Sequence, residues 1–364
     1  MRYQALLFVP FFFWLSNAVE LTDLFFDRGA GPGSCRPPQD EIVKSWLRDT
    51  VTLVDSTLAA LGGAINNDKA LKRNLNAWFG IKVKATDMDP VEADRLDTVT
   101  RSVQSVKDFL EMRNPSLKEP QIDGSGGKPW LFCNSDWQHE TELMFDGDLG
   151  LPIYAADGVT QGNLRTWPIP DNANPADPFI DILLKMRQGS APDWAHYAYW
   201  SPDIRDYVIE KASARYPGNP PSWCNGQDMT PEEQRFGLTS VSQLRDTITI
   251  CPDAFDEAKS EPFETIDLTF ASAAARSVRM DLEKTAPRSL TLFHELIHLT
   301  SGVENTPDVG TKPTECLKNR LRKLDMSRNP DSIVFFAWSY YLENNGPEPK
   351  FSWHSGKSAA RLAQ

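Results

Sequence analysis

The chain has 364 residues, of which 24% are charged and 10% aromatic, and its formal net charge is −12 at pH 7. A chain of this length can bury the core of one large domain. The acidic balance, without a clustered basic segment, argues against nucleic acid and against an anionic membrane surface as partners.

The first 18 residues have the layout of a secretory signal peptide. Arg2 precedes an apolar run from Ala5 to Leu15, and small residues follow at Ser16 and Ala18. The run is shorter than the roughly 20 apolar residues that cross a membrane. We predict cleavage after Ala18 and a secreted, extracellular protein with no membrane anchor.

Helices are predicted for most of the N-terminal third, after an N-terminal extension at 19–34. Between Asp40 and Leu61 the apolar residues recur at steps of three and four, and Gly62 ends that stripe. Similar patterns predict helices from about 67 to 78 and from 91 to 112.

The composition changes between about 124 and 221, where Gly, Pro, Asp and aromatic residues are frequent. Short strands are predicted near Trp130–Cys133 and Leu151–Tyr154, and a helix from Pro178 to Met186. We interpret the aromatic run Trp194–Trp200 as packing in a loop-rich core, with His196 in a structural role.

The C-terminal part returns to regular elements. β-Branched residues alternate at Thr247–Cys251, which predicts a strand ended by Pro252. A helix is predicted from Ser289, a candidate N-cap, to about 300, with Gly302 as its stop. Helices at 312–323 and 330–343 and a polar tail at 355–364 complete a helix-rich α+β fold with a small sheet.

Five cysteines lie far apart, with no CxxC pair that would indicate a zinc ribbon or a redox centre. In an exported chain they predict two disulfides and one free thiol. They are Cys35, Cys133, Cys224, Cys251 and Cys316.

His294-Glu295-Leu296-Ile297-His298 is the segment that carries chemistry. Residues four apart share one face of a helix, so both imidazoles can reach one zinc ion at about 2.0–2.1 Å. Glu295 follows the first ligand and can act as general base towards a water that zinc activates. We predict one Zn²⁺ per chain.

A catalytic zinc needs a third protein ligand and one open position. The only later histidine is His354, which lies on a segment interpreted as a loose tail. Asp308 lies in a turn-rich loop that folds back after the helix, but spacing alone leaves the choice of ligand open. The acidic candidates are Glu304, Asp308, Glu315, Asp325 and Asp331.

The chain resembles the aspzincin metalloendopeptidases, the group of deuterolysin and the fungal lysine-specific endopeptidases. In that family a loop after the zinc helix supplies an aspartate ligand, and Thr306-Pro-Asp308-Val-Gly310 stands at the matching distance. Further similar segments are Ala77–Gly80 with its following helix, Thr247–Pro252 and Asn329–Ala337. The segment from about 136 to 221 has no counterpart and is interpreted as an insertion in a domain that spans 35–354.

The resemblance implies a zincin-like fold with His294, His298 and Asp308 as ligands and Glu295 as general base. It also implies that 247–252 is an edge strand that binds extended substrate. Asp331 matches a substrate-binding aspartate that favours a cationic residue after the scissile bond. The competing interpretation of Asp331 is a helix N-cap or a structural hydrogen-bonding group.

The resemblance further implies disulfides Cys35–Cys133 and Cys224–Cys251, which leaves Cys316 free. One position departs from the family pattern, since Thr311 stands where members carry a tyrosine whose hydroxyl steadies the oxyanion. Losing such a donor costs about 10²–10³ in rate. Tyr340 and Tyr341 are candidate replacements.

We therefore expect a secreted, monomeric zinc endopeptidase that hydrolyses polypeptides with water in a single step. The alternative is an exported zinc-binding protein or effector with little or no peptidase activity. Thr311 and the insertion favour that alternative, whereas Glu295 argues against it because zinc capture needs no base. A third hypothesis, a structural secreted protein with a coincidental motif, would be decided by zinc content.

Overall fold

The computed structural model describes residues 19–26, 29, 31–63, 65–84, 88–113, 128–147, 149–187, 196–211, 224, 236–241 and 246–360. The predicted signal peptide at 1–18, parts of the predicted insertion and residues 361–364 lie outside the described residues.

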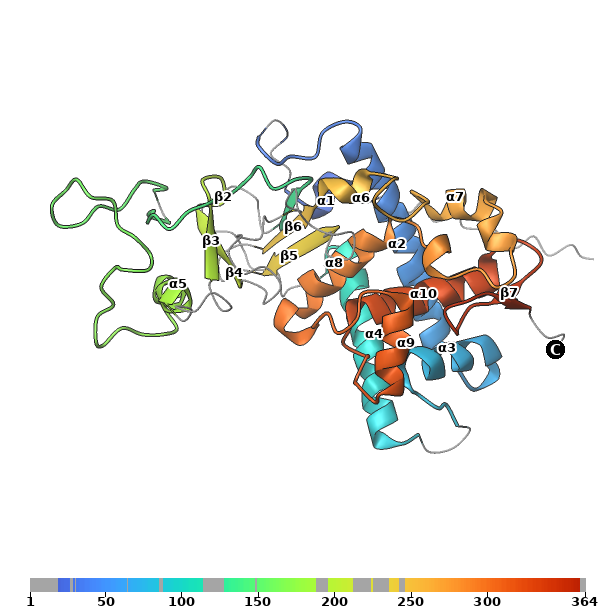
Figure 1. Ribbon diagram of the computed structural model, residues 1–364. Helices are drawn as coiled ribbons and strands as arrows, with labels where there is room; N and C mark the ends of the chain where they lie inside the picture. The colour runs from blue at the N-terminus through green and yellow to red at the C-terminus, as the bar shows by residue number, and fades with distance from the viewer. Residues whose placement is uncertain are drawn as a thin grey trace, which may run out of the picture.

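The described helices and strands follow one another as shown in Figure 1. The α-helices are α1 (Leu21–Leu24), α2 (Gln39–Gly62), α3 (Lys69–Phe79), α4 (Pro90–Leu110), α5 (Pro178–Arg187), α6 (Pro252–Phe255), α7 (Ile266–Ala271), α8 (Leu290–Ser301), α9 (Pro313–Leu321) and α10 (Pro330–Asn345). The 3₁₀ helices are η1 (Ile65–Asn67), η3 (Ala274–Arg276), η4 (Glu283–Thr285) and η5 (Val303–Asn305). The strands are β1 (Trp130–Phe132), β2 (His139–Glu140), β3 (His196–Ser201), β4 (Asp206–Lys211), β5 (Gly237–Val241), β6 (Asp246–Ile250), β7 (Phe351–Ser352) and β8 (Ala359–Ala360).

The predicted α+β class is confirmed, with many helices and small sheets. All seven helices predicted from periodicity are present, and their ends differ from the predicted ends by no more than two residues. They are α2, α3, α4, α5, α8, α9 and α10. The strands predicted near 130 and 247 are also present, as β1 and β6.

Helix α8 lies within the main hydrophobic core. It packs against helices α2, α4 and α10 and against strands β5 and β6. Eight of its 12 residues are buried, among them Phe293, Leu296 and Ile297. A helix that is apolar on nearly every side is stable only at the centre of a domain. The core therefore fixes α8, and with it the side chains of the histidine motif.

The sheet beside α8 has the strand order β1-β6-β5. Strand β6 pairs in parallel with β1 and antiparallel with β5, so Ile248 lies between Leu131 and Thr239. The expected edge position of 247–252 is therefore wrong, because β6 has a neighbour on both sides. Among the described residues, β5 is the edge strand next to α8.

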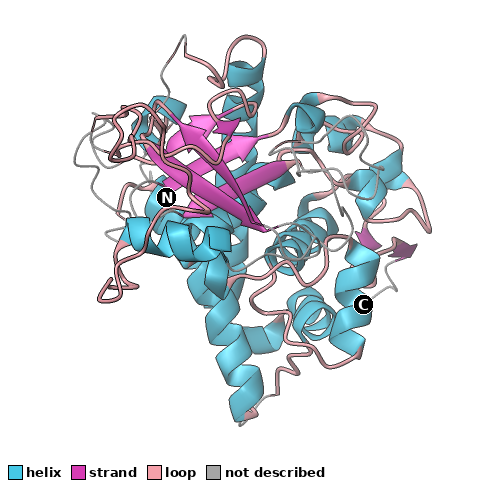
Figure 2. Ribbon diagram, turned by 60° about the vertical axis from the view of Figure 1, so that its left-hand side comes forward, coloured by secondary structure: helices cyan, strands magenta, loops and turns pink. Residues whose placement is uncertain are grey.

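A second sheet, β2-β3-β4, belongs to the predicted insertion and packs with α5 around a smaller apolar cluster. This part lies to one side of the helical bundle in Figure 1, and Figure 2 shows its strands close to those of the first sheet. The aromatic run is strand β3 where it is described, rather than loop. The strand expected at Leu151–Tyr154 is wrong, since isolated bridges at Pro152 and Tyr154 replace it. The limits of the insertion stay a prediction.

Both ends of the described chain pack on the core. Leu24 and Phe25 of the N-terminal extension are 2% and 1% exposed, and Phe26 exchanges backbone hydrogen bonds with the segment of β1. At the other end, β7 and β8 pair, and the Met280 N–H donates to the Ser358 hydroxyl. The interpretation of residues around His354 as a loose tail is wrong, because this hairpin is folded against the domain.

The predicted disulfides Cys35–Cys133 and Cys224–Cys251 are both present, and Cys316 is a buried free thiol. Two disulfides are compatible with an exported protein. Within the described part of the chain, we find no helix with the length and apolarity that a membrane span requires.

Candidate metal centre

The two histidines of α8 lie one turn apart on the same face, as the spacing predicts. Helix α8 ends at Gly302, whose φ of 85° is the left-handed region that glycine adopts without strain. Helix η5 then turns the chain back, which brings the loop with Asp308 to the histidines.

Three electron-pair donors converge beside α8. The His294 Nε2 atom lies 3.1 Å from His298 Nε2, and Asp308 Oδ1 lies 3.5 Å from the first nitrogen and 3.3 Å from the second. A tetrahedral metal site with bonds of about 2.0–2.1 Å places its ligand atoms roughly 3.3–3.4 Å apart. The three sides of this triangle match that spacing, so the group formed by His294, His298 and Asp308 could hold a metal ion.

The other nitrogen of each ring has its own acceptor. The Thr306 hydroxyl donates to the Gly302 carbonyl at 2.7 Å, so it accepts the N–H of His298 Nδ1 at 2.8 Å. The His294 Nδ1 atom lies 3.3 Å from the Asp331 carboxylate, which can only accept when it is ionised. With these acceptors in place, both Nε2 atoms of the neutral rings direct lone pairs at each other and at Asp308, an arrangement that a cation between them or a proton on one ring stabilises.

The carboxylates around His294 also favour a positive charge at this site. Burial alone would lower the pKa of His294, but the carboxylates of Asp331 and Asp308 outweigh burial and raise it to about 10. Burial opposes ionisation of Asp308, yet its hydrogen bond with His298 and the charge of His294 hold the pKa of this carboxyl below its usual value.

Glu295 points from α8 towards strand β5 and is 3% exposed. The Thr239 hydroxyl lies 2.7 Å from the Glu295 Oε2 atom and donates to it. A Cβ atom at Gly237 would stand 2.5 Å from Oε1, so only glycine leaves room for this carboxylate. Burial raises the pKa of Glu295, and the nearby histidines counteract only part of that rise.

Asp331, at the start of α10, lies against His294 with 15% of its side chain exposed. Burial raises the pKa of Asp331, although the contact with His294 acts in the opposite direction. Its carboxylate is in position to orient the His294 ring. A role in substrate selection stays a prediction.

The other acidic candidates lie outside the group of three ligands. Glu315 accepts the backbone N–H of Thr311 at the start of α9, and Asp325 accepts from the Ser327 hydroxyl. Glu304 is exposed beside Asn305. His354 pairs with the Ser352 hydroxyl in the C-terminal hairpin.

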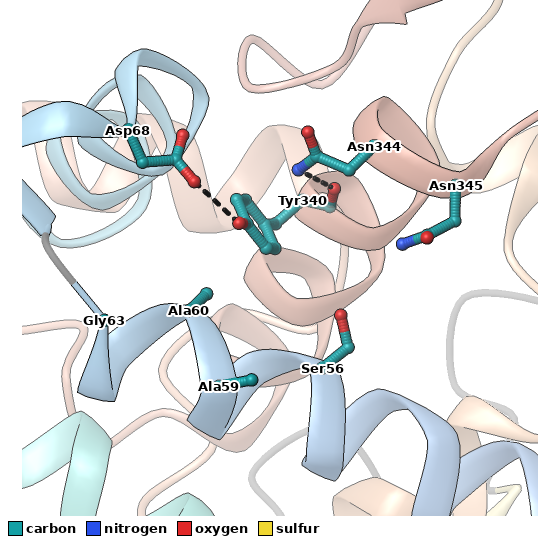
Figure 3. Close-up of a pocket in the computed structure, with 8 residues that line it drawn as sticks. All are labelled: Ser56, Ala59, Ala60, Gly63, Asp68, Tyr340, Asn344 and Asn345. Carbon is teal, nitrogen blue, oxygen red and sulfur yellow. Dashed lines mark hydrogen bonds between the residues drawn. The ribbon is translucent and has the colours of Figure 1, made fainter. Parts of the chain in front are cut away.

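Neither Tyr340 nor Tyr341 stands in for the tyrosine hydroxyl that the resemblance implies. The Tyr340 hydroxyl donates to Asp68 at 2.7 Å, in a hollow of about 400 Å³ between α2, α3 and α10 (Figure 3). Tyr340 is nine residues beyond Asp331, which corresponds to roughly 14 Å along the helix. The Tyr341 ring stacks on Phe270. The described contacts of these two candidates therefore lie away from the three ligands.

Thr239 and Gly237 were not predicted from the sequence as residues of the site. Strand β5, Gly-Leu-Thr-Ser-Val, shows no alternation of apolar and polar residues, so no periodic signal marks it. Only tertiary packing brings it to Glu295.

Comparisons with protein-family models, with curated proteins and with solved structures find no match to this chain.

Proposed function

We propose that the protein is a secreted zinc-dependent endopeptidase with a zincin-like active site. The observation that carries the proposal is the triangle of His294 Nε2, His298 Nε2 and Asp308 Oδ1, with sides of 3.1 to 3.5 Å. Two imidazoles and one carboxylate are a ligand set typical of catalytic zinc, and three protein ligands leave a fourth position open.

Glu295 supports hydrolysis rather than metal storage. A bound Zn²⁺ would polarise the scissile carbonyl and lower the pKa of water towards neutrality. The Glu295 carboxylate, held by Thr239 beside the two histidines, can take a proton from the attacking water and pass it to the leaving amine. A pure zinc-capture site has no use for a buried base at this position.

The edge strand β5 supports a polypeptide as substrate. Its pairing with β6 uses one side of the strand, and Thr239 of β5 touches Glu295. An extended peptide can add to a free strand edge through backbone hydrogen bonds. Such a peptide would pass directly beside the base. The two disulfides support secretion.

The test is hydrolysis of an unfolded protein by the purified, zinc-loaded chain, with fragments identified by mass spectrometry. Glu295→Gln is the matched control, because it keeps the shape of the side chain and removes the base. We expect the parent to cut and the variant to lose at least about 10²-fold in rate at equal zinc content.

One observation favours a second candidate, a zinc-binding protein without peptidase activity. The hydrogen bonds of Thr311 are made with Glu315, so no hydroxyl replaces the family tyrosine there. If parent and Glu295→Gln each bind one zinc ion and neither cuts, this second function replaces the first.

A further inference from the structure

The third ligand, Asp308, belongs to a loop rather than to a helix or strand. Its side chain is 46% exposed, whereas those of His294 and His298 are 16% and 7% exposed. Loops on the surface are more mobile than the elements that they connect. A ligand on such a loop needs a separate anchor if it is to hold a metal ion with fixed geometry.

Three of the five side-chain contacts of Asn329 reach the loop that follows Asp308 and can serve as this anchor. Its side chain is fully buried, and its Oδ1 atom accepts the backbone N–H groups of Val309 at 2.8 Å and Gly310 at 3.3 Å. Its Nδ2 group donates to the Gly310 carbonyl at 3.1 Å and to the Ser332 hydroxyl at 3.0 Å. The amide thus binds both backbone polar groups of Gly310, two residues after the ligand.

These contacts take Asn329 away from its ordinary local role. It occupies the N-cap of α10, where an asparagine side chain usually accepts an N–H of its own helix. Here no such side-chain cap forms, and Oδ1 is given to the loop instead. This arrangement favours the loop at the expense of the helix.

The same end of α10 also contacts a second ligand, since Asp331 lies 3.3 Å from His294 Nδ1. Asn329 and Asp331 therefore connect one rigid helix end to Asp308 on one side and to His294 on the other. On the far side of the loop, Asn319 donates to the Val309 carbonyl at 2.8 Å.

We propose that Asn329 is the positioning residue of the metal centre, which holds the Asp308 loop at ligand distance and so sets metal affinity. The proposal rests on the metal site of the proposed function but not on peptidase activity. Changes to outer contacts of metal ligands typically cost about 10–100-fold in affinity.

The experiment measures the dissociation constant for Zn²⁺ by competition with a chromophoric chelator, in the full mature chain. In Asn329→Asp, the side chain keeps its shape but places an oxygen against the Gly310 carbonyl, so we expect an affinity loss of about 10–100-fold. Asn344→Asp, near the other end of α10, is the matched control and should leave the affinity unchanged. The absorption spectrum of the Co²⁺-loaded chain should change in the first variant alone.

A double-mutant comparison separates positioning from general stability. In an Asp308→Ala background the ligand is gone, so Asn329→Asp should cause no further loss of affinity. An equal loss in both backgrounds overturns the proposal, as does an unchanged affinity in Asn329→Asp. If that variant does not fold, Asn319→Ala removes the other anchor, and its loss must likewise vanish with Asp308→Ala.

Failure of the proposed function is visible separately. A parent chain that binds no zinc refutes both proposals. A parent that binds zinc but does not cut refutes peptidase activity alone, because the role of Asn329 is judged by affinity and by the Co²⁺ spectrum.

Discussion

Thr239 is the residue on which the orientation of Glu295 depends, because no other described side chain donates a hydrogen bond to that carboxylate. A hydrogen bond to a charged group contributes about 1.5–3 kcal/mol. Without it the buried carboxylate can rotate away from the attacking water.

We expect Thr239→Val to lower kcat/KM for peptide hydrolysis by about 10–100-fold, since 1.4 kcal/mol corresponds to a factor of ten. Zinc content should not change, because Thr239 touches none of the three ligands. Thr239→Ser restores the hydroxyl and should recover most of the activity. Equal rates for the valine and serine variants would show that the hydroxyl does not orient the base.

The individual site residues differ in how far the sequence predicts them. The four-residue spacing on a helix is sufficient to pair His294 with His298. Asp308 needed a family resemblance, because it is one of five acidic candidates after the helix and spacing does not separate them. Thr239 was beyond prediction, since its contact with Glu295 spans 56 residues and passes through a strand with no periodic signal.

At the scale of elements, the N-terminal extension contributes Leu24 and Phe25 to the main hydrophobic core. The Phe25 ring meets Phe109 of α4 edge to face, with centroids 5.4 Å apart, and the Lys128 ammonium donates to the Thr22 carbonyl. The following residue, Phe26, extends the sheet beside β1 on the side away from β5. The extension therefore lies at the opposite edge of the sheet from the strand that contacts Glu295.

We expect Phe25→Ala to reduce the free energy of unfolding by about 3–5 kcal/mol, because it leaves a cavity in the main core. Thr22→Ala changes an exposed side chain of the same segment and should stay within about 0.5 kcal/mol of the parent. Chemical denaturation of the two variants measures the difference. Equal stabilities would mean that the extension is dispensable for folding.

The helices were predictable and several strands were not, for a physical reason. The buried face of a helix is visible in its own sequence, because apolar residues recur at steps of three and four, as in α2 and α4. Strands β3 and β5 each pair with the strand that follows directly, β4 and β6, but their own residues do not alternate between apolar and polar, so neither shows the period of a strand. The alternating residues of β6 predict a strand, but they do not show whether it pairs on one side or on both.

At the scale of the whole molecule, one partly buried carboxyl makes stability depend on pH. Burial raises the pKa of Glu261 to about 7, and the charges of Glu283 and Asp331 add to this rise while Arg288 opposes it. The folded state then binds the proton more tightly than the unfolded state, whose pKa is 4.5. Stability is therefore lost as the pH rises from about 4.5 to about 7, by up to roughly 3 kcal/mol.

We expect Glu261→Gln to remove this dependence, because the amide carries no charge at any pH. Relative to the parent, its free energy of unfolding should increase by up to about 3 kcal/mol between pH 4 and pH 8. Urea denaturation of both metal-free proteins across this range measures the difference. A constant difference would mean that Glu261 titrates alike in the folded and unfolded chains.

The three ligands of the metal centre all come from residues 294–308, a stretch of 15 residues. Loops this short close at little entropic cost, so the unfolded chain can also gather these side chains around an ion. A metal that binds both states stabilises the fold less than its affinity for the folded state suggests. The contact of Glu295 with Thr239 on β5 and the hydrogen bonds of Asn329 to the Asp308 loop form only when the chain folds. Under the proposed function, metal capture is thus a local capacity of one short peptide, and reactivity is what the rest of the protein adds to it.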